Sequence, residues 1–226
     1  MFYYYGRKEK IFSHYPKPKY DTIIEPFAGS AAYSMNYHEK NVILIEKDVK
    51  IANLWSYLIN VTSEEIMSLP LLADGESLND EKFQYLSNDQ KTIIGFFLNP
   101  GSAQPKKSPG KFCGWNQINK IRLSNDVKKV KHWKIINNDY TSIENIPATW
   151  FVDPPYQGNG GKYYKHGNKN FNYDSLREWC LNRYGQLIVC ENSEANWMNF
   201  TPLVDIQGQK HKTKEVIFYQ ENLHYE

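Results

Sequence analysis

Short runs rich in β-branched and aromatic residues recur along this chain of 226 residues and alternate with stretches of helical period. A glycine turn with a short predicted helix (28–40) separates the first two runs, and a second predicted helix (172–184), capped by Asn172 or Asp174, separates two later ones. Strands joined by helices return in parallel, so the alternation predicts an α/β fold whose mostly parallel sheet carries helices on both faces. The predicted strands are DTIIEPF (21–27), NVILIEKD (41–48), WKIINNDY (133–140), TWFVDPPY (149–156), GQLIVCEN (185–192) and KEVIFYQ (214–220).

Residues 61–130 lack this alternation. Two helical stretches (63–72 and 79–99) are followed by a loop rich in Pro, Gly and Lys and then by a basic helix. A chain of this length can build one sizeable core with a smaller insertion. We therefore interpret residues 61–130 as an inserted region, and residues 1–60 and 131–226 as one sheet domain.

The composition argues against several classes of protein. Cys113, Cys180 and Cys190 form no CxxC pair and the histidines show no metal-ligand spacing, so neither a disulfide framework nor a metal site is expected. No apolar stretch has the length of a membrane span, and MFYYYGRKEK lacks the apolar core of a signal peptide, which predicts a cytoplasmic protein. With a net charge of +2, attraction for a polyanion must come from local clusters of lysine and arginine.

The predicted strand TWFV continues directly into Asp153, Pro154, Pro155 and Tyr156. Each proline fixes its own φ and restricts the preceding residue, so the Asp153 carboxylate and the Pro154 carbonyl are held at the carboxyl end of a strand, where α/β folds place their ligands. Two acceptors aimed at one point can bind both hydrogens of an aromatic amino group and stabilise the positive charge that develops as its nitrogen attacks. Tyr156 offers a face on which a base can stack. A proline turn without a ligand is the alternative.

Polar residues at other predicted strand ends indicate where a second ligand binds. The first strand ends on Glu25 and turns at Gly29, where a ligand can approach the backbone closely. The second ends on Glu46, at the position where doubly wound folds bind ribose hydroxyls, and a third ends on Asp139, within reach of an adenine. Because the turn is neither GxGxxG nor a Walker loop, we expect a nucleoside cofactor without phosphates. A plain turn and solvated strand-end acids are the alternatives.

Together these residues resemble the Dam-like DNA adenine methyltransferases, the alpha group in which the cofactor motif precedes an inserted recognition region and DPPY follows it. The stretches ATWFVDPPYQGNGGKYYKH and FNYDSLREWCLNRYGQLIVCEN are especially similar to small adenine methylases of phages and prophages. The resemblance implies a Rossmann-like S-adenosylmethionine-dependent methyltransferase fold, in a prokaryotic or phage-infected cell. YYYGRKEKI is similar to the family's N-terminal motif and IEPFAGSA to its FxGxG motif, so S-adenosylmethionine is expected to contact Tyr4, Gly6, Lys8, Glu25, Phe27, Gly29, Glu46, Asp139 and Tyr140.

Three positions depart from the family pattern. Ala31 stands in place of the last glycine of FxGxG, Arg7 replaces a second glycine before the lysine, and Glu46 stands where aspartate is common. The loss of a glycine is expected to tighten the cofactor pocket and weaken binding. None of these departures touches DPPY.

A base inside a duplex cannot reach such a site, so an enzyme of this kind must extrude it. The loop after DPPY and the inserted region both supply lysines for phosphates and polar side chains for base edges. A solvated loop and ordinary surface polarity are the alternatives for these segments. The expected DNA contacts are Lys106, Lys107, Lys111, Asn116, Arg122, Lys162, Tyr163, Tyr164 and Lys165.

The sequence therefore predicts methyl transfer from S-adenosylmethionine to the 6-amino group of a flipped adenine in double-stranded DNA. Methylation at cytosine C5 is not expected, because none of the three cysteines follows a proline as its nucleophile commonly does. Adenine in RNA and N4 of cytosine are the alternative substrates. A nucleic-acid-binding module that has lost catalysis is the alternative from another class.

Overall fold

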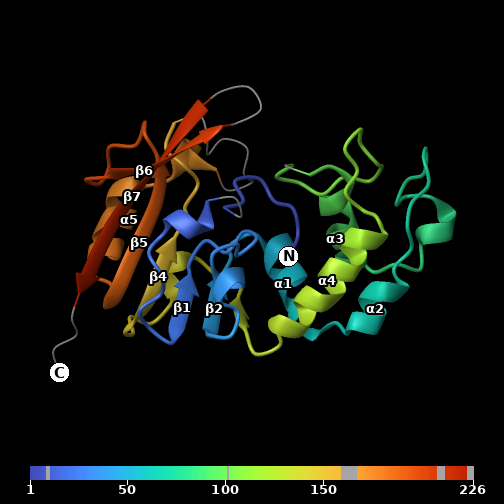
Figure 1. The fold of residues 1–226 in the computed structure, drawn as a ribbon, viewed down its shortest axis with the longest axis horizontal. Helices are drawn as coiled ribbons and strands as arrows, with labels where there is room; N and C mark the ends of the chain where they lie inside the picture. Colours follow the sequence, from blue (N-terminus) through green and yellow to red (C-terminus); the bar gives the residue numbers. More distant parts are fainter. Residues whose placement is uncertain (9–10, 101, 159–166, 208–211, 223–226) are drawn as a thin grey trace.

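The described residues of the chain build a seven-stranded sheet of order β3-β2-β1-β4-β5-β7-β6 (Figure 1). The computed structural model describes residues 1–8, 11–100, 102–158, 167–207 and 212–222. Strands β1 to β5 run parallel, and β7 lies antiparallel between β5 and β6. The strands are β1 (Thr22–Glu25), β2 (Asn41–Ile45), β3 (Lys134–Ile136), β4 (Ala148–Val152), β5 (Gly185–Asn192), β6 (Thr201–Gln207) and β7 (Lys212–Asn222).

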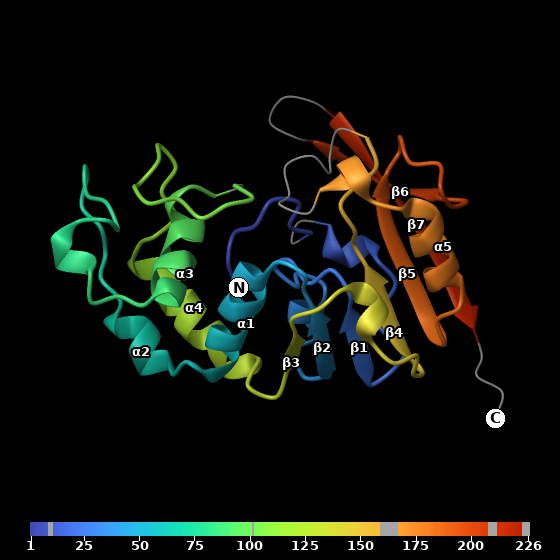
Figure 2. The same ribbon diagram turned by 180° about the vertical axis from the view of Figure 1, so that it is seen from behind.

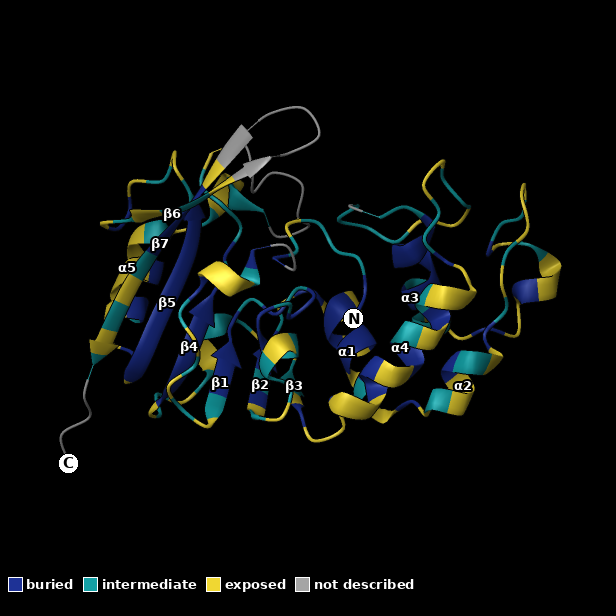
Figure 3. Ribbon diagram, in the orientation of Figure 1, coloured by how far each residue is buried: buried dark blue, intermediate teal, exposed yellow. Residues whose placement is uncertain are grey.

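Apolar side chains cover both faces of this sheet. Successive residues of one strand point to opposite faces of the sheet. Ile23 and Phe151 therefore belong to the buried cluster on one face, and Ile24 and Trp150 belong to the cluster on the other face. Figure 3 shows the central strand β5 buried along most of its length. The predicted Rossmann-like fold, a mostly parallel sheet covered on both sides, is confirmed.

The α-helices are α1 (Val49–Asn60), α2 (Ser63–Ser68), α3 (Asn88–Leu98), α4 (Gln117–Lys129) and α5 (Tyr173–Leu181). Helix α5 covers one face of the sheet through Leu176 and Cys180. Short 3-10 helices occur at Phe12–His14, Ser34–Tyr37, Glu81–Phe83, Tyr140–Ser142 and Asn168–Asn170.

Helices α2, α3 and α4 lie beside the sheet, beyond its β3 edge, and not over its faces (Figures 1 and 2). The single helical stretch expected over 79–99 is divided into two pieces. The break occurs because the Ser87 hydroxyl accepts the backbone N–H of Gln90, whose side chain in turn accepts the N–H of Ser87. Because of this capping box, α3 begins as a separate helix at Asn88.

Residues 1–8 connect the helical part to the sheet, passing between them in both ribbon views (Figures 1 and 2). Phe2 packs on Phe96 of α3 with ring centroids 5.2 Å apart, and Tyr3 packs on Phe97 at 5.1 Å. A few residues later the same segment reaches the carboxyl ends of β1 and β4, where Lys8 contacts Asp153. We call residues 1–8 the bridging segment.

Candidate functional site

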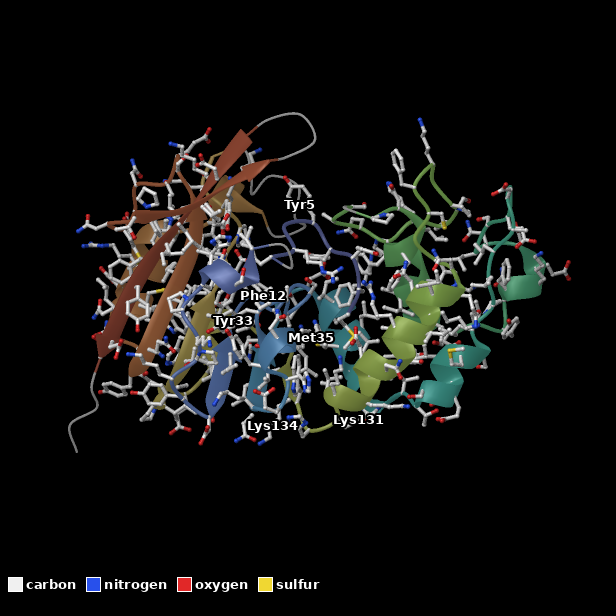
Figure 4. The ribbon with its side chains drawn as sticks, in the orientation of Figure 1. Tyr5, Phe12, Tyr33, Met35, Lys131 and Lys134 are labelled. Atoms are coloured by element: carbon white, nitrogen blue, oxygen red, sulfur yellow. The ribbon has the colours of Figure 1, made fainter. Side chains whose placement is uncertain are left out.

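A cavity of about 560 Å³ lies at the carboxyl ends of β1, β2 and β4. Strand order reverses between β1 and β4, so the cavity stands at the switch point where open α/β sheets bind ligands. Its size is typical of pockets for small molecules. Figure 4 shows Tyr5, which lines the cavity, at the end of the molecule opposite Lys134.

All nine residues expected at a cofactor line this cavity. They come from four separate parts of the chain: the bridging segment, the turn after β1, the end of β2 and the stretch after β3. Their roles in binding stay predictions. The residues are Tyr4, Gly6, Lys8, Glu25, Phe27, Gly29, Glu46, Asp139 and Tyr140.

The turn after β1 holds the bridging segment close to the sheet. Gly29 has φ +45°, and a Cβ there would lie 3.3 Å from the Tyr4 ring, so the ring packs directly on the glycine backbone. The Trp55 indole N–H donates to the Gly29 carbonyl at 2.8 Å and fixes the turn to α1. Ala31 also has a left-handed backbone, with φ 46°. The chain therefore keeps at Ala31 a conformation that a glycine adopts more easily.

Two carboxylates at the ends of β1 and β2, the buried Glu25 and the half-buried Glu46, are bonded to backbone N–H groups. Glu25 accepts the N–H of Ser34 at 2.9 Å, and burial raises its pKa to about 8. Glu46 accepts the N–H of Gly29 at 3.2 Å through one oxygen and that of Asp48 at 2.9 Å through the other. Burial raises the pKa of Glu46 to about 6. Glu25 is thus mainly protonated at neutral pH, whereas Glu46 is mainly ionised.

Aromatic rings form one wall of the cavity. Phe27 lies 5.3 Å from Tyr140 and 5.9 Å from Phe171, measured between ring centroids. Phe171 opens the family-like stretch FNYDSLREWCLNRYGQLIVCEN, but it was not expected at the cofactor. Asp139 lies beside this wall and pairs with Lys47 at 3.0 Å.

The segment after β4 presents Asp153 to the cavity and anchors the residues that follow. The carbonyls of Pro155 and Tyr156 accept the Tyr173 hydroxyl at 2.7 Å and the Asn168 amide at 2.8 Å. Within the described part of the chain, no donor bonds the Pro154 carbonyl. Of the DPPY residues, Asp153 and Pro155 line the cavity.

Lys8 contacts Asp153 and Tyr156, two of the three groups that DPPY was expected to offer to a base. Its ammonium lies 2.9 Å from the Asp153 carboxylate and 4.5 Å from the centroid of the Tyr156 ring. Burial raises the pKa of Asp153, and the Lys8 charge acts in the opposite direction. The Tyr156 hydroxyl donates to Glu215 of β7. Neither this hydrogen bond nor the contacts of Lys8 with Asp153 and Tyr156 were anticipated.

The residues expected to contact DNA fall into three groups. Lys106, Lys107 and Lys111 are exposed on the loop between α3 and α4, which lies at the same end of the molecule as the carboxyl ends of the strands (Figure 1). Asn116 and Arg122 have contacts within the protein. The remaining four, Lys162, Tyr163, Tyr164 and Lys165, lie outside the described residues.

Asn116 and Arg122 serve α4 and the bridging segment. The Asn116 side chain caps α4 by accepting the N–H of Asn119 at 3.0 Å, so its oxygen has a structural use. The Arg122 guanidinium lies 5.4 Å from the centroid of the Tyr3 ring. Two of its nitrogens are buried without a hydrogen-bond partner among the residues that the structure describes.

A metal site needs several ligand side chains close together, and a membrane span needs a long apolar helix. In the described ranges, no three His, Cys, Asp or Glu side chains are grouped so that they could hold a metal ion. None of the described helices is both long and apolar enough to span a membrane.

Comparisons with known proteins identify a family pattern in the part of the chain that supplies the bridging segment, Gly29 and Glu46. The chain is similar to the solved structure of yhhF from Escherichia coli, a candidate methyltransferase, with 12% sequence identity, 90% of this chain and 76% of that one covered, and a TM-score of 0.38. It is also similar to the solved structure of HI0767 from Haemophilus influenzae, a candidate methylase, with 14% sequence identity, 90% of this chain and 80% of that one covered, and a TM-score of 0.38. No curated protein sequence matches the chain. Residues 4–94 match the model of the D12 class N6 adenine-specific DNA methyltransferases, a range that includes the bridging-segment motif, Gly29 and Glu46 but not DPPY. Over those residues the chain carries the sequence pattern of that methyltransferase family, and the resemblance to DNA adenine methyltransferases predicted from its motifs is confirmed.

Proposed function

We propose that this protein transfers a methyl group from S-adenosylmethionine to the 6-amino group of an adenine in DNA. The observation that carries the proposal is the position of Asp153 in the same cavity as the turn and carboxylates of the family-matched region. One cavity thus joins a group suited to an aromatic amine and groups suited to a nucleoside.

The cavity residues fit S-adenosylmethionine. Glu46 is an ionised acceptor at the end of β2, suited to ribose hydroxyls, and the wall of Phe27, Tyr140 and Phe171 suits an adenine ring. Gly29 has no side chain to fill the space beside Tyr4. When bound, S-adenosylmethionine supplies an electrophilic methyl group.

The chain's own residues then orient and polarise the target. The amino group of adenine is a weak nucleophile because its lone pair is delocalised into the ring. The Asp153 carboxylate and the Pro154 carbonyl accept its two hydrogens, and the negative charge of Asp153 stabilises the positive charge that develops on the nitrogen. The proton leaves the nitrogen during or after transfer, with no covalent enzyme intermediate.

The inserted region and the loop after DPPY are proposed to hold the DNA. Lys106, Lys107 and Lys111 are exposed at the end of the molecule where the strands end, so they can contact phosphates flanking an extruded base. Phosphate contacts fix the position of a duplex without reading its sequence.

Labelled methyl transfer tests this function directly. Purified protein is incubated with isotopically labelled S-adenosylmethionine and either unmethylated plasmid DNA or RNA, and the product is digested to nucleosides and separated by chromatography. We expect label in N6-methyldeoxyadenosine from DNA. Label in N4-methyldeoxycytidine, or in RNA alone, would assign a different substrate, and no label in either nucleic acid would contradict methyl transfer.

Gly29→Ala is expected to weaken cofactor binding about tenfold, because the new Cβ presses on the Tyr4 ring at 3.3 Å and the ring lines the cavity. The left-handed backbone adds about 1–2 kcal/mol of strain. Gly75→Ala is the matched control: Gly75 has φ +83° but no atom within 4 Å of the new Cβ. Calorimetric titration and thermal unfolding of both variants separate the two effects, and equal cofactor affinity in the two would contradict the contact with Tyr4.

Replacing Lys106, Lys107 and Lys111 with alanine is expected to make DNA binding less dependent on salt. The affinity of a protein for DNA falls as the salt concentration rises, and removing one phosphate contact makes the slope of log affinity against log salt less negative by about one unit. The slope of the triple variant should therefore be less negative by about three units. Lys134→Ala is the control, since Lys134 is exposed at the opposite end of the molecule (Figure 4). Fluorescence anisotropy across a salt series gives both slopes. An unaltered slope in the triple variant would remove these lysines from the interface.

A further inference from the structure

Three described side chains contact the Lys8 ammonium, which also donates to the Gly6 carbonyl at 3.2 Å. Its ammonium lies 2.9 Å from Asp153 and 3.7 Å from Glu215, above one face of the Tyr156 ring. An adenine that stacks on this face of Tyr156 and bonds Oδ1 of Asp153 through its amino group needs the place that this ammonium occupies. A base bound in this way would displace the ammonium from Asp153.

A lysine displaced from Asp153 needs another carboxylate, because an unpaired buried charge is costly. The Lys8 side chain is only 8% exposed, and that of Glu215 is 4% exposed. Glu25 is a poor substitute, since burial keeps it mainly protonated at neutral pH. Among the residues that the structure describes, Glu215 is the other carboxylate within ion-pair distance of Lys8.

Glu215 is held in a fixed position on β7. It accepts the hydroxyl of Tyr15 at 2.6 Å and that of Tyr156 at 2.5 Å, both through Oε1, the oxygen that also faces Lys8. The chain thus fixes a second carboxylate beside the one that DPPY provides. A neutral side chain such as that of glutamine could accept the hydrogen bonds from the two tyrosines. A carboxylate is needed only if this position also has to pair with a positive charge.

We propose that Lys8 blocks Asp153 until a base enters, and that Glu215 is the positioning residue to which the Lys8 ammonium then moves. This inference rests on the proposed function. Glu215 contacts neither base nor cofactor: it acts by receiving Lys8 and so leaving Asp153 and a face of Tyr156 to the adenine. The charge of Glu215, rather than its hydrogen bonds, is what the transfer of Lys8 requires.

Glu215→Gln and Glu215→Asp distinguish charge from hydrogen bonding. Gln has the size of Glu and can accept both tyrosine hydroxyls but is neutral; Asp is shorter but keeps the charge, and the long Lys8 side chain can follow it. We expect Glu215→Gln to raise KM for plasmid DNA about tenfold, since the ion pair with Asp153 must then break without a new carboxylate. Glu215→Asp should stay within about threefold of wild type. Cofactor affinity should be unaltered in both.

Labelled methyl transfer at saturating S-adenosylmethionine gives KM and kcat, and calorimetry gives cofactor affinity. The control is Glu221→Gln, an exposed position on the same strand that pairs with Lys19. Wild-type activity in Glu215→Gln, a larger defect in Glu215→Asp, or equal defects in both would each overturn the inference. A wild-type protein that methylates no nucleic acid would contradict the proposed function instead, before any variant is compared.

Discussion

Asp153→Ala is expected to reduce single-turnover methyl transfer by ~10²–10³, the usual effect of removing one oriented electrostatic partner of a transition state. The variant loses the acceptor for one amino hydrogen and the negative charge that faces the developing cation. The fold should persist, because Asp153 lies after the end of β4 and Lys8 keeps its second carboxylate, Glu215, at 3.7 Å.

Single-turnover transfer at saturating S-adenosylmethionine measures this effect, together with a cofactor titration of the same variant. Asp21→Ala serves as control: the Asp21 side chain is 96% exposed and precedes β1, at the end of the strand away from the cavity. An Asp153→Ala variant that binds cofactor normally and transfers methyl groups near the wild-type rate would reject the two-acceptor mechanism. Loss of cofactor binding would instead show that Asp153 belongs to the cofactor site.

Glu46→Ala is expected to weaken S-adenosylmethionine binding about 10- to 100-fold, because hydrogen bonds to a charged acceptor contribute about 1.5–3 kcal/mol each and 1.4 kcal/mol is tenfold in affinity. The change also removes the acceptor of the Gly29 and Asp48 N–H groups, so the backbone beside the cavity loses two hydrogen bonds. Affinity for DNA in the absence of cofactor should be nearly unaltered. Glu39→Ala, an exposed position just before the same strand, is the control.

The pKa of Glu46 adds a test that needs no substitution. Because this pKa is raised to about 6, the side chain is ionised at pH 7 and becomes protonated as the pH falls through that value. A protonated carboxyl is a weaker acceptor for ribose hydroxyls, so cofactor affinity should fall below about pH 6 in the wild type. Glu46→Gln, which cannot titrate, should lack this step. Calorimetric affinities that are flat from pH 5 to 8 in the wild type would contradict the assignment of Glu46.

The sheet was predictable where local pattern and tertiary structure agree. Strands β1, β2, β4 and β5 lie within short apolar runs rich in β-branched residues, which are typical of buried parallel strands. Strand β6 was missed, because Thr201–Gln207 carries Pro202 near its start and forms an edge strand, where sequence signals are weakest. Helix α1 was also missed, although Asp48 caps it: the residues before it had been interpreted only as a strand end.

The site was predictable to the extent that its residues stand at strand ends. Glu25, Glu46 and Asp153 share one edge of the sheet because β1, β2 and β4 are parallel. Glu215 was not predictable, since it belongs to an antiparallel strand and meets Tyr15 across 200 positions of sequence. No local pattern records such a contact.

The bridging segment has a thermodynamic consequence. Its Phe2 and Tyr3 pack on α3, its Tyr4 packs on Gly29 beside the cavity, and its Lys8 pairs with Asp153. We therefore expect any movement of α3 on DNA binding to displace groups that line the cavity, and a ligand in the cavity to restrain the segment that packs on α3. Linkage requires the two effects to be equal: whatever factor DNA applies to cofactor affinity, the cofactor applies to DNA affinity. Through these eight residues, α3 and the Asp153 carboxylate are expected to belong to one binding equilibrium.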